Sequence, residues 1–566
     1  MRELDDGSNR MNGAEAMVRM LEAHGVRHVF GLCGDTSLPF YDALYQLDHD
    51  IDHILTRDER SAAYMADGYA RVTGRVGVCE GPSGGGATYI LPGVVEANES
   101  SIPVLAITTD VATTSAGRFP LTELDQEALF RPLTSHNAVI RDAALLPRMV
   151  RAAFKSMTTG RPGAAHLGVP FDVQKAPVDP GEIWADDALG RFPAKPTAPD
   201  PVAVERAASM LLNAQAPLVI CGGGVVIAGA EEALARLVDQ FDLPVATTIS
   251  GQGSLAETHR ACAGVVGSNG GIPEGRALIE ASDLILFVGC RAGSVTTERW
   301  RFPKAEQKII HIDSAPAVIG AAYPTEVALI GDARLALLGL GEALRGCIAE
   351  FDGKARAAAV MAARDRRLLE NDETDKKPIR PERLIRAMNK LLPEDAVVVA
   401  DPGTPCPYIS AYWRQPARGR KFISNRAHGA LGYALSAAIG AKIGRPDAPV
   451  LAVMGDGSFG FTCGELETVV RLDLPITFVV ISNAVFGWIK AGQRSGFGER
   501  YFSVDFSRTD HAAVARAFGM EAHRIEDPRE VETALARALA SDRPVLLDLV
   551  CQPLHEAAAP VSEWVA

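Results

Sequence analysis

The chain has 566 residues, of which 47% are hydrophobic and 22% charged, and its net charge is −13 from 57 basic and 70 acidic residues. This composition is that of a globular protein of about three domains, and the lack of any Lys/Arg block argues against nucleic acid or an anionic membrane as partner. The nine cysteines contain no C-x-x-C pair, so neither a zinc cage nor a disulfide framework is expected.

Three further features of the sequence bear on its location. No signal peptide is expected from the polar start of the sequence, and apolar runs such as Leu474 to Ile481 are too short to cross a bilayer. Together with the cysteine usage, this predicts a soluble protein of the reducing cytoplasm. The polar, acidic stretch from Met1 to Arg10 is expected to be a loose tail.

Strand-like runs alternate with helical stretches along the whole chain, a pattern typical of parallel α/β domains. We expect three such parallel-sheet α/β domains, at residues 11–180, 200–350 and 378–552, with a Pro-rich linker from Pro180 to Pro201. The strands expected are 28–30, 76–79, 104–108 and 165–169 in the first domain, 217–221, 245–248, 284–288 and 309–312 in the second, and 396–400, 450–454, 476–481 and 544–549 in the third. The first and third domains have similar lengths and a similar spacing of strands along the chain, which is compatible with their being two related domains.

The third domain contains the strongest functional motif. The strand 450–454 runs directly into Gly455-Asp456-Gly457-Ser458, and the next strand ends in Ser482-Asn483, with Asn483 twenty-seven residues after Asp456. Neighbouring parallel strands would bring this carboxylate and this amide to one edge of the sheet, where open α/β folds bind ligands. Such hard oxygen donors suit Mg²⁺, while the glycines and the following helix N-terminus suit a diphosphate. A G-D-G run alone would be an ordinary turn.

The segment Gly455 to Asn483 resembles the thiamine diphosphate motif shared by acetolactate synthases, pyruvate and benzoylformate decarboxylases and their relatives. The resemblance extends over nearly the whole chain and implies, in order, a pyrimidine-binding, a central and a diphosphate-binding domain. It implies that Asp456, Asn483 and the backbone carbonyl of Val485 hold Mg²⁺, and that Gly455, Asp456, Gly457, Ser458 and Asn483 bind the cofactor. Ser482 stands where the family more often has a first Asn.

Glu59 is the catalytic residue that the resemblance implies in the first domain. It precedes the run Ala66-Asp67-Gly68-Tyr69-Ala70-Arg71, in register with the segment that carries the activating glutamate in acetolactate synthases. A carboxyl group bonded to the cofactor's aminopyrimidine promotes the imino form, which removes the thiazolium C2 proton. By composition alone Glu59 is a surface residue in a charged turn. Asp58 replaces the His that is usual before this glutamate.

A second loop of the third domain, Asn425 to Tyr433, resembles the loop that bends the cofactor. By position, Leu431 is the apolar wedge beneath the two rings and the Gly429 carbonyl accepts a bond from the aminopyrimidine, whereas a plain interpretation makes Leu431 a core leucine in a helical stretch. His428 is a candidate proton relay or a structural histidine beside a turn. Gly403 and Thr404 follow the domain's first strand, where relatives bind the diphosphate.

The central domain gives only a weak nucleotide signal. Gly222-Gly223-Gly224 follows a strand, but Ile227 breaks the G-x-G-x-x-G spacing, and residues 289–296 match the flavin-contacting stretch of acetolactate synthases only in part. FAD is therefore possible but not favoured. In the first domain, Tyr89 replaces an Asn, and Leu121-Thr122 replaces a Phe-Gln pair that faces the substrate, which implies a different substrate pocket.

The resemblance implies a thiamine-diphosphate- and Mg²⁺-dependent decarboxylase or carboligase of 2-oxo acids. The cofactor's thiazolium serves as carbon nucleophile and electron sink. The alternatives are C–C cleavage of a diketone or 2-hydroxyketone, and a catalytically silent cofactor-binding module. The family also implies a homodimer or homotetramer with the active site at the subunit interface, acting on a small-molecule 2-oxo acid or ketone.

Overall fold

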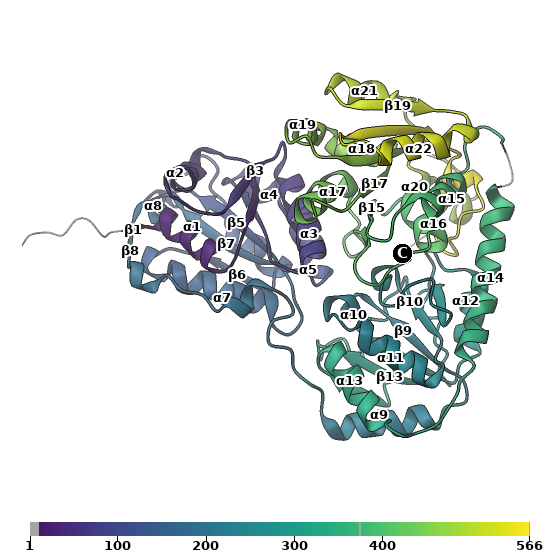
Figure 1. Cartoon of the computed structure of the whole chain (residues 1–566). Coiled ribbons are helices and arrows are strands. Elements are labelled where there is room, and N and C mark those ends of the chain that lie inside the picture. Colours follow the sequence, from purple (N-terminus) through teal and green to yellow (C-terminus); the bar gives the residue numbers. More distant parts are fainter. Residues whose placement is uncertain (1–10, 373–374, 565–566) are drawn as a thin grey trace, which may run out of the picture. The chain divides into compact units, whose positions relative to one another are not determined.

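Three parallel six-stranded sheets, each flanked by helices, make up the protein. The computed structural model describes residues 11–372 and 375–564, so the tail from Met1 to Arg10 lies outside the described residues (Figure 1). Strands buried on both faces explain why the inner strands read as continuous apolar runs. The predicted fold class, three parallel α/β domains, is confirmed.

The N-terminal sheet has the strand order β3-β2-β4-β5-β7-β6. Its strands are β2 (His28–Gly31), β3 (Asp52–Leu55), β4 (Gly77–Gly81), β5 (Val104–Asp110), β6 (His136–Val139) and β7 (Ala165–Pro170). The helices are α1 (Gly13–Ala23), α2 (Leu38–Gln46), α3 (Glu59–Thr73), α4 (Gly85–Tyr89), α5 (Leu91–Glu99), α6 (Gln126–Phe130), α7 (Leu146–Thr158) and α8 (Phe171–Lys175). A two-stranded antiparallel pair, β1 (Met11–Asn12) with β8 (Pro177–Val178), ties the two ends of this domain together.

Helices cover both faces of this sheet. The helices α3 and α5 pack on one face, and α1, α2 and α7 on the other (Figure 1). The contact with α3 is so close that a Cβ added to Gly77 would lie 2.1 Å from the Ala66 carbonyl oxygen. Because successive strand residues face opposite sides, Gly77 and Gly81 face α3 while Val78 and Glu80 face the side of α2.

The central sheet has the order β11-β10-β9-β12-β13-β14. Its strands are β9 (Pro217–Cys221), β10 (Val245–Thr247), β11 (Cys262–Val265), β12 (Leu284–Val288), β13 (Lys308–Asp313) and β14 (Val327–Ile330). The helices are α9 (Pro201–Leu212), α10 (Gly223–Ile227), α11 (Glu231–Phe241), α12 (Pro273–Glu280), α13 (Ala333–Ala343) and the connecting α14 (Gly353–Asp372).

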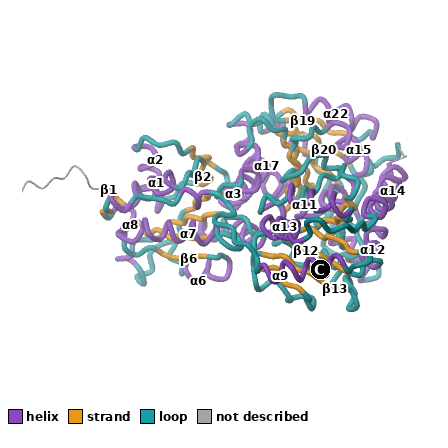
Figure 2. The backbone as a smooth tube through the Cα atoms, turned by 60° about the horizontal axis from the view of Figure 1, so that its bottom comes forward, coloured by secondary structure: helices purple, strands orange, loops and turns teal. Residues whose placement is uncertain are grey.

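The C-terminal sheet has the order β16-β15-β17-β18-β20-β19. Its strands are β15 (Val397–Ala400), β16 (Phe422–Ser424), β17 (Val450–Gly455), β18 (Ile476–Ser482), β19 (Glu521–Ile525) and β20 (Val545–Val550). The helices are α15 (Pro381–Leu391), α16 (Pro405–Tyr412), α17 (Tyr433–Gly444), α18 (Asp456–Thr462), α19 (Leu466–Arg471), α20 (Gly487–Gly496), α21 (His511–Ala517) and α22 (Val531–Leu539). In Figure 2 the strands lie side by side with helices around them.

The N-terminal and C-terminal sheets share one topology. Numbered along the chain, both run second, first, third, fourth, sixth, fifth, whereas the central sheet runs third, second, first, fourth, fifth, sixth. The suspected relation between the first and third domains is therefore supported by identical strand order, and the central domain is of a different type.

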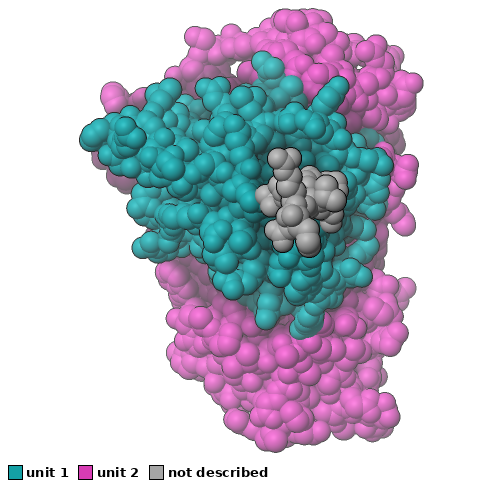
Figure 3. All heavy atoms as spheres, turned by 90° about the vertical axis from the view of Figure 1, so that its left-hand side faces the viewer, with its two compact units in different colours: residues 1–195, 439–445 teal, residues 196–438, 446–566 magenta. Residues whose placement is uncertain are grey.

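The chain forms two compact units. One consists of residues up to Lys195 together with Ile439–Arg445, and the other of Pro196–Ala438 and Pro446–Ala566 (Figure 3). Among the described residues, no helix has both the length and the apolar character that a membrane crossing requires. All nine cysteines are free.

Candidate functional site

The predicted metal residues, and the cofactor residues Gly403, Thr404 and Gly455 to Ser458, lie at the carboxyl ends of β15, β17 and β18. These strands are adjacent and parallel, and the strand order reverses between β15 and β17. At such a switch point the connections leave the sheet in opposite directions and open a ligand site at its edge. The segments that follow these strands are the loop of residues 401–404, the start of α18 at Asp456, and the loop of residues 483–486.

Asp456 is held against the neighbouring loop. Its Oδ2 accepts hydrogen bonds from the backbone N–H groups of Asn483 at 2.7 Å and Ala484 at 2.6 Å, and its Oδ1 accepts one from Gly457 at 2.8 Å. Burial raises the pKa of this carboxyl, and the three backbone donors oppose the rise. The spacing of twenty-seven residues thus brings Asp456 and Asn483 together, as the sequence predicted.

The Asn483 amide and the Val485 carbonyl are both available for a ligand. Within the described part of the chain, the Asn483 side chain makes no hydrogen bond. Val485 lies opposite Asp505 in an antiparallel pair, and the hydrogen bonds of this pair are made by the residues on either side: Phe486 N–H donates to Val504, and Phe506 N–H donates to Ala484. The carbonyl of Val485 itself therefore points away from Asp505.

This donor set fits a hard divalent cation. It offers one carboxylate, one amide oxygen and one backbone carbonyl, and residues 11–372 and 375–564 contain no cluster of three or more His, Cys, Asp or Glu side chains for a softer metal. Mg²⁺ binds in this way, through few protein ligands, with phosphate oxygens and water completing its octahedron. The helix α18 (Asp456–Thr462) begins inside the motif and has only seven residues, too short for its N-terminus alone to make an anion site.

A buried ionic network behind this loop was not predicted. The Ser482 hydroxyl donates to Asp548 and contacts His511 Nδ1 at 2.8 Å, and Arg524 contacts Asp548 at 2.6 Å. Burial raises the pKa of Asp548, but the bonds from His511 and Ser482 outweigh it, so the net pKa is lowered. Ser482, the last residue of β18, thus anchors the start of the loop that begins with Asn483. A cavity of about 80 Å³ adjoins it, lined in part by Asp456 and His511.

The loop from Asn425 to Gly432 is a turn before α17, not the helical stretch of the plain interpretation. His428 and Gly429 are exposed, Gly429 has φ +76°, and Leu431 is half-buried. The loop's end is tied to α18, because Gly432 N–H donates to Ser458 Oγ at 3.1 Å and its carbonyl accepts from Thr462 at 3.0 Å.

Asp401 is a second unpredicted residue of this edge. It is buried, and it accepts hydrogen bonds from the Tyr433 and Ala434 N–H groups at 3.0 and 3.2 Å. Burial raises its pKa to about 7, although these bonds and one from Ser458 lower it. Asp401 therefore links the first strand of the domain to α17 and α18, through backbone donors that lie 32 and 33 residues away in the chain, which no local sequence pattern indicates.

Gly403 and Thr404 follow Asp401. A Cβ added to Gly403 would meet nothing within 4 Å, so the backbone there is accessible to a ligand, whereas Thr404 is buried at the start of α16. Gly455 is equally open, but a Cβ on Gly457 would lie 2.7 Å from the Phe486 ring.

Glu59 is the first residue of α3, in the unit that holds the N-terminal sheet. It is only 8% exposed, so the interpretation of Glu59 as a surface residue in a charged turn is wrong. Asp58 is the N-cap of α3 and accepts from the Arg60 N–H at 2.8 Å, so it has a structural role at the start of this helix. Burial raises the pKa of Glu59, and the nearby negative charge of Asp58 adds to the rise.

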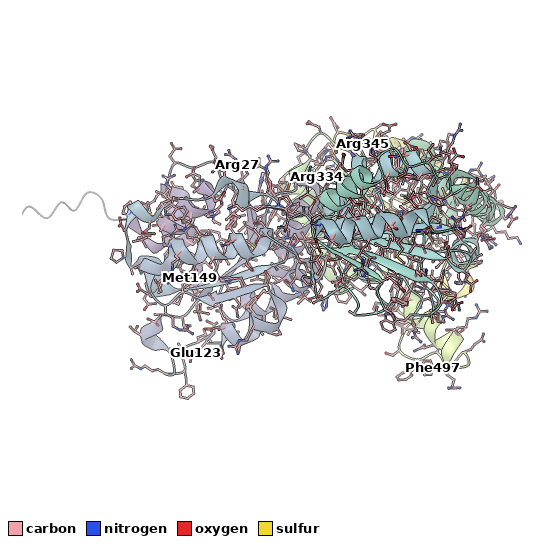
Figure 4. All side chains as sticks on the ribbon, turned by 90° about the horizontal axis from the view of Figure 1, so that it is seen from below. Arg27, Glu123, Met149, Arg334, Arg345 and Phe497 are labelled. Atoms are coloured by element: carbon pink, nitrogen blue, oxygen red, sulfur yellow. The ribbon has the colours of Figure 1, made fainter. Side chains whose placement is uncertain are left out.

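The segment around Leu121-Thr122, where a different substrate pocket is expected, is an exposed loop. Leu121 is 87% exposed, and Thr122 has φ +70° and shares a hydrogen bond with Ser83 at 2.7 Å. Glu123 of the same loop lies at the outer edge of its unit (Figure 4).

The glycines of the central domain have a packing explanation. A Cβ on Gly222 would lie 2.1 Å from the Gly289 carbonyl oxygen, and one on Gly224 2.7 Å from Gly289 Cα. The turn between β9 and α10 thus packs directly on the loop after β12, and this close packing by itself requires glycine at both positions.

Comparison with known proteins gives one consistent result. Residues 11–129 match the N-terminal TPP binding domain, 204–340 the central domain and 401–549 the C-terminal TPP binding domain of thiamine pyrophosphate (thiamine diphosphate) enzymes. The probable acetolactate synthase large subunits of Methanococcus aeolicus and Methanocaldococcus jannaschii are 35% and 36% identical, over 96% of this chain and 92% of theirs.

A bacterial relative agrees. The acetolactate synthase isozyme 2 large subunit of Escherichia coli is 34% identical over 546 residues, 96% of either chain. The chain therefore belongs to the thiamine pyrophosphate enzyme family, as a thiamine-diphosphate-dependent enzyme related over nearly its whole length to acetolactate synthase large subunits.

Proposed function

We propose that the protein decarboxylates a 2-oxo acid, joins the remaining fragment to a second carbonyl compound, or does both, and that Mg²⁺ is required. The observation that carries this proposal is the contact of the Asp456 carboxylate with the backbone of Asn483 and Ala484 at the switch point of the C-terminal sheet. The relatives' names, acetolactate synthase, support the second of these reactions, the joining of two fragments.

The metal would be bound by Asp456, Asn483 and the Val485 carbonyl. The buried Asp456 supplies the negative charge, and the free amide oxygen and carbonyl supply neutral ligands. Buried carboxylates are stabilised when a cation lies against them, and no salt bridge to Asp456 is formed among the described residues, although the charge of His511 lowers its pKa.

The remaining cofactor contacts are proposed at residues whose backbone or side chain is accessible to a ligand. We expect the open backbone at Gly403 and Gly455 to lie against the diphosphate, and Gly429 and Leu431 against the rings. The other proposed contacts are Thr404, Gly457 and Ser458. The Ser458 hydroxyl already forms hydrogen bonds with Gly432 and Asp401, so its main role is to position these residues of the site.

Glu59 is proposed as the activating acid. When bound, thiamine diphosphate supplies a carbon nucleophile and an electron sink. Glu59 would hold a proton on its carboxyl against the pyrimidine, and its burial and raised pKa favour the protonated form that can donate. His428 is proposed only as a proton relay, because it is exposed.

We propose that FAD is not required. Gly222 and Gly224 are explained by packing on Gly289, so the glycine run gives no independent support for a nucleotide. Absorbance of the purified protein near 450 nm, together with mass analysis of released small molecules, tests this; stoichiometric flavin would contradict it.

C–C cleavage of a diketone or 2-hydroxyketone is the second candidate function. It is favoured by the loop of Leu121 and Thr122, which departs from the synthases and lies exposed. Product analysis after incubation with pyruvate, benzoylformate and a cyclic dione separates the two, since only the first function releases carbon dioxide. A catalytically silent module would give no product from any of them.

The test of the assignment is Glu59→Gln. This change keeps the shape but removes the acidic proton, so exchange of the bound cofactor's C2 proton for deuterium should slow by roughly 10²–10⁴-fold, with binding little altered. Asp48→Asn is the matched control, because it removes an exposed carboxylate of the same unit. Wild-type exchange in Glu59→Gln would contradict the role of Glu59.

A further inference from the structure

Asp548 is a fully buried carboxylate that none of the proposed roles uses. It lies in β20, which pairs with β18 and β19. Its Oδ1 accepts a hydrogen bond from the Ser482 hydroxyl at the end of β18. Its Oδ2 accepts one from the N–H of His511, the first residue of α21, at 3.0 Å, and one from Arg524 on β19 at 2.6 Å. These four residues, the Asp548 cluster, join elements whose contacts lie 66, 37 and 24 residues from Asp548 in the chain.

Arg524 supplies the positive charge of this cluster. The guanidinium nitrogen that contacts Asp548 also donates to the Thr509 carbonyl at 3.1 Å, and Nε donates to Glu526 at 3.1 Å. Arg524 thus fixes the chain just before α21 to β20. Because hydrogen bonds between ionised groups are roughly twice as strong as those between neutral groups, β19, β20 and the start of α21 form a rigid base.

Ser482 connects this base to the loop of residues 483–486. Its carbonyl accepts a hydrogen bond from the Cys551 N–H at 2.9 Å, so its main chain is fixed to the end of β20. Its hydroxyl has a single proton, which it donates to Asp548, and it therefore accepts from Nδ1 of His511 at 2.8 Å. The residue directly before the loop is thus held at both its main chain and its side chain.

His511 also contacts the other side of the proposed metal site. Its ring lies edge-on to the ring of Phe459, with the centroids 5.3 Å apart and an angle of 85° between the planes. Phe459 belongs to α18, the helix that begins with Asp456. His511 therefore touches both the strand that leads to Asn483 and the helix that carries Asp456.

The loop of residues 483–486 has a strained backbone. Ala484 has φ +59°, in the left-handed region that residues with a Cβ rarely adopt. Its N–H and that of Asn483 both donate to Asp456, at 2.6 and 2.7 Å. Such a conformation persists only where the surrounding contacts hold it, and the Asp548 cluster holds the chain directly before it.

We propose that Asp548 is a positioning residue for the metal: through its cluster it holds the loop of residues 483–486 against α18, so that the ligands from both are in place before the cation binds. This rests on the metal site of the proposed function. Within the described chain, the side chain of Asp548 forms no hydrogen bond to a proposed ligand, so its effect passes through Ser482 and His511. A preorganised ligand set binds more tightly because the loop need not be ordered on binding.

The first test needs neither metal nor cofactor. Hydrogen–deuterium exchange, resolved to single amides, reports how often the bonds from the Asn483 and Ala484 N–H groups to Asp456 open. Asp548→Asn removes the charge and one acceptor, and exchange at both amides should become about tenfold faster. Ser482→Ala, which removes only the hydroxyl, should also speed exchange, whereas Ser482→Thr keeps the hydroxyl and should exchange as the wild type does. Wild-type exchange in both Asp548→Asn and Ser482→Ala would overturn the inference.

Glu257→Gln is the matched control for the loss of a buried ion pair. Glu257 and Arg364 lie 2.6 Å apart in the same compact unit, and both are buried. Among the described residues, neither side chain bonds to the loop of residues 483–486. This variant should lower the free energy of unfolding, as Asp548→Asn does, but leave exchange at the two loop amides unchanged. Equally fast exchange in both variants would show a general loss of stability and would contradict a specific role of Asp548.

The consequence for the metal is measured with Mn²⁺ as the probe, through the EPR signal of the free ion, in the presence of saturating thiamine diphosphate. The Kd for Mn²⁺ should rise about 10–100-fold in Asp548→Asn, the usual effect of losing a residue behind the ligands, and stay unchanged in Glu257→Gln. Asp456→Ala tests the proposed function separately. If Asp456→Ala binds Mn²⁺ as the wild type does, the metal site is wrong and the inference falls with it. If Asp456→Ala loses Mn²⁺ but Asp548→Asn binds it normally, only the positioning role is overturned.

Discussion

Among single residues, Asp456 gives the most direct test of the metal site. Asp456→Ala should weaken thiamine diphosphate binding in the presence of Mg²⁺ by roughly 3–5 kcal/mol, because the cation loses its only protein carboxylate. Isothermal titration calorimetry measures the change. Asp447→Ala removes an exposed carboxylate near the opposite end of the same strand and should bind as wild type does. Equal affinity in the two variants would exclude Asp456 as a ligand.

Glu80 should make stability depend on pH. Its pKa is raised from 4.5 to about 7 by burial, so its contribution to stability is fully present below pH 4.5 and is lost as the pH rises through about 7. Relative to Glu80→Gln, which has no proton to lose, the wild type should lose on the order of 3 kcal/mol across that range. Urea titrations at pH 4.5, about 6 and about 8 measure this.

A substitution at an exposed position provides the control for that series. Glu394→Gln, in the exposed turn before β15, should follow the wild type at every pH. A constant difference between wild type and Glu80→Gln at all three pH values would show that Glu80 has the same protonation in the folded and unfolded states.

At the scale of elements, the position of α3 depends on its contact with α5. A Cβ on Gly93 of α5 would lie 2.3 Å from Ala63 Cβ of α3, so Gly93→Ala should cost about 1–3 kcal/mol of stability through overpacking. Gly341→Ala, also within a helix but with nothing within 4 Å, should instead stabilise by about 0.4–1 kcal/mol. Denaturant unfolding compares the two, and effects of the same sign would contradict the packing argument.

The predicted and missed strands differ in one respect. In each sheet the four predicted strands are the inner ones, and the two missed strands are the edges: β3 and β6, β11 and β14, and β16 and β19. Inner strands are buried on both faces and read as apolar runs. Edge strands are short or partly exposed, as in the alternating burial of β14, so their sequences resemble loops.

At the scale of the whole molecule, we predict at least a homodimer. Phe119 is 95% and Phe502 82% exposed, one in each compact unit, and Phe497, the C-cap of α20, lies at the outer edge of its unit (Figure 4). Large exposed apolar side chains of this kind mark interaction surfaces. Sedimentation equilibrium should give a dimer or tetramer, and a fully active monomer would contradict the prediction.

A mixing experiment tests whether two chains share each active site. Glu59→Gln and Asp456→Ala are each expected to be inactive alone. If one chain supplies Glu59 and its partner Asp456, mixed dimers have one intact site, and randomly exchanged subunits should recover about a quarter of wild-type activity. Recovery of no activity after demonstrated subunit exchange would show that each site is built from one chain.

The sequence by itself determined the fold class, the inner strands and the pairing of Asp456 with Asn483, because buried strands and the spacing between them are local features of the chain. It could not reveal Glu80, Asp401 or the network of Ser482 and Asp548, since their partners are distant in sequence, 43 residues for Ser37 and Glu80 and 66 for Ser482 and Asp548. Only the tertiary structure decided that Glu59 is buried. A carboxyl in a charged segment looks solvent-exposed until the sheet and helices pack around it, and that burial is what alters its proton affinity.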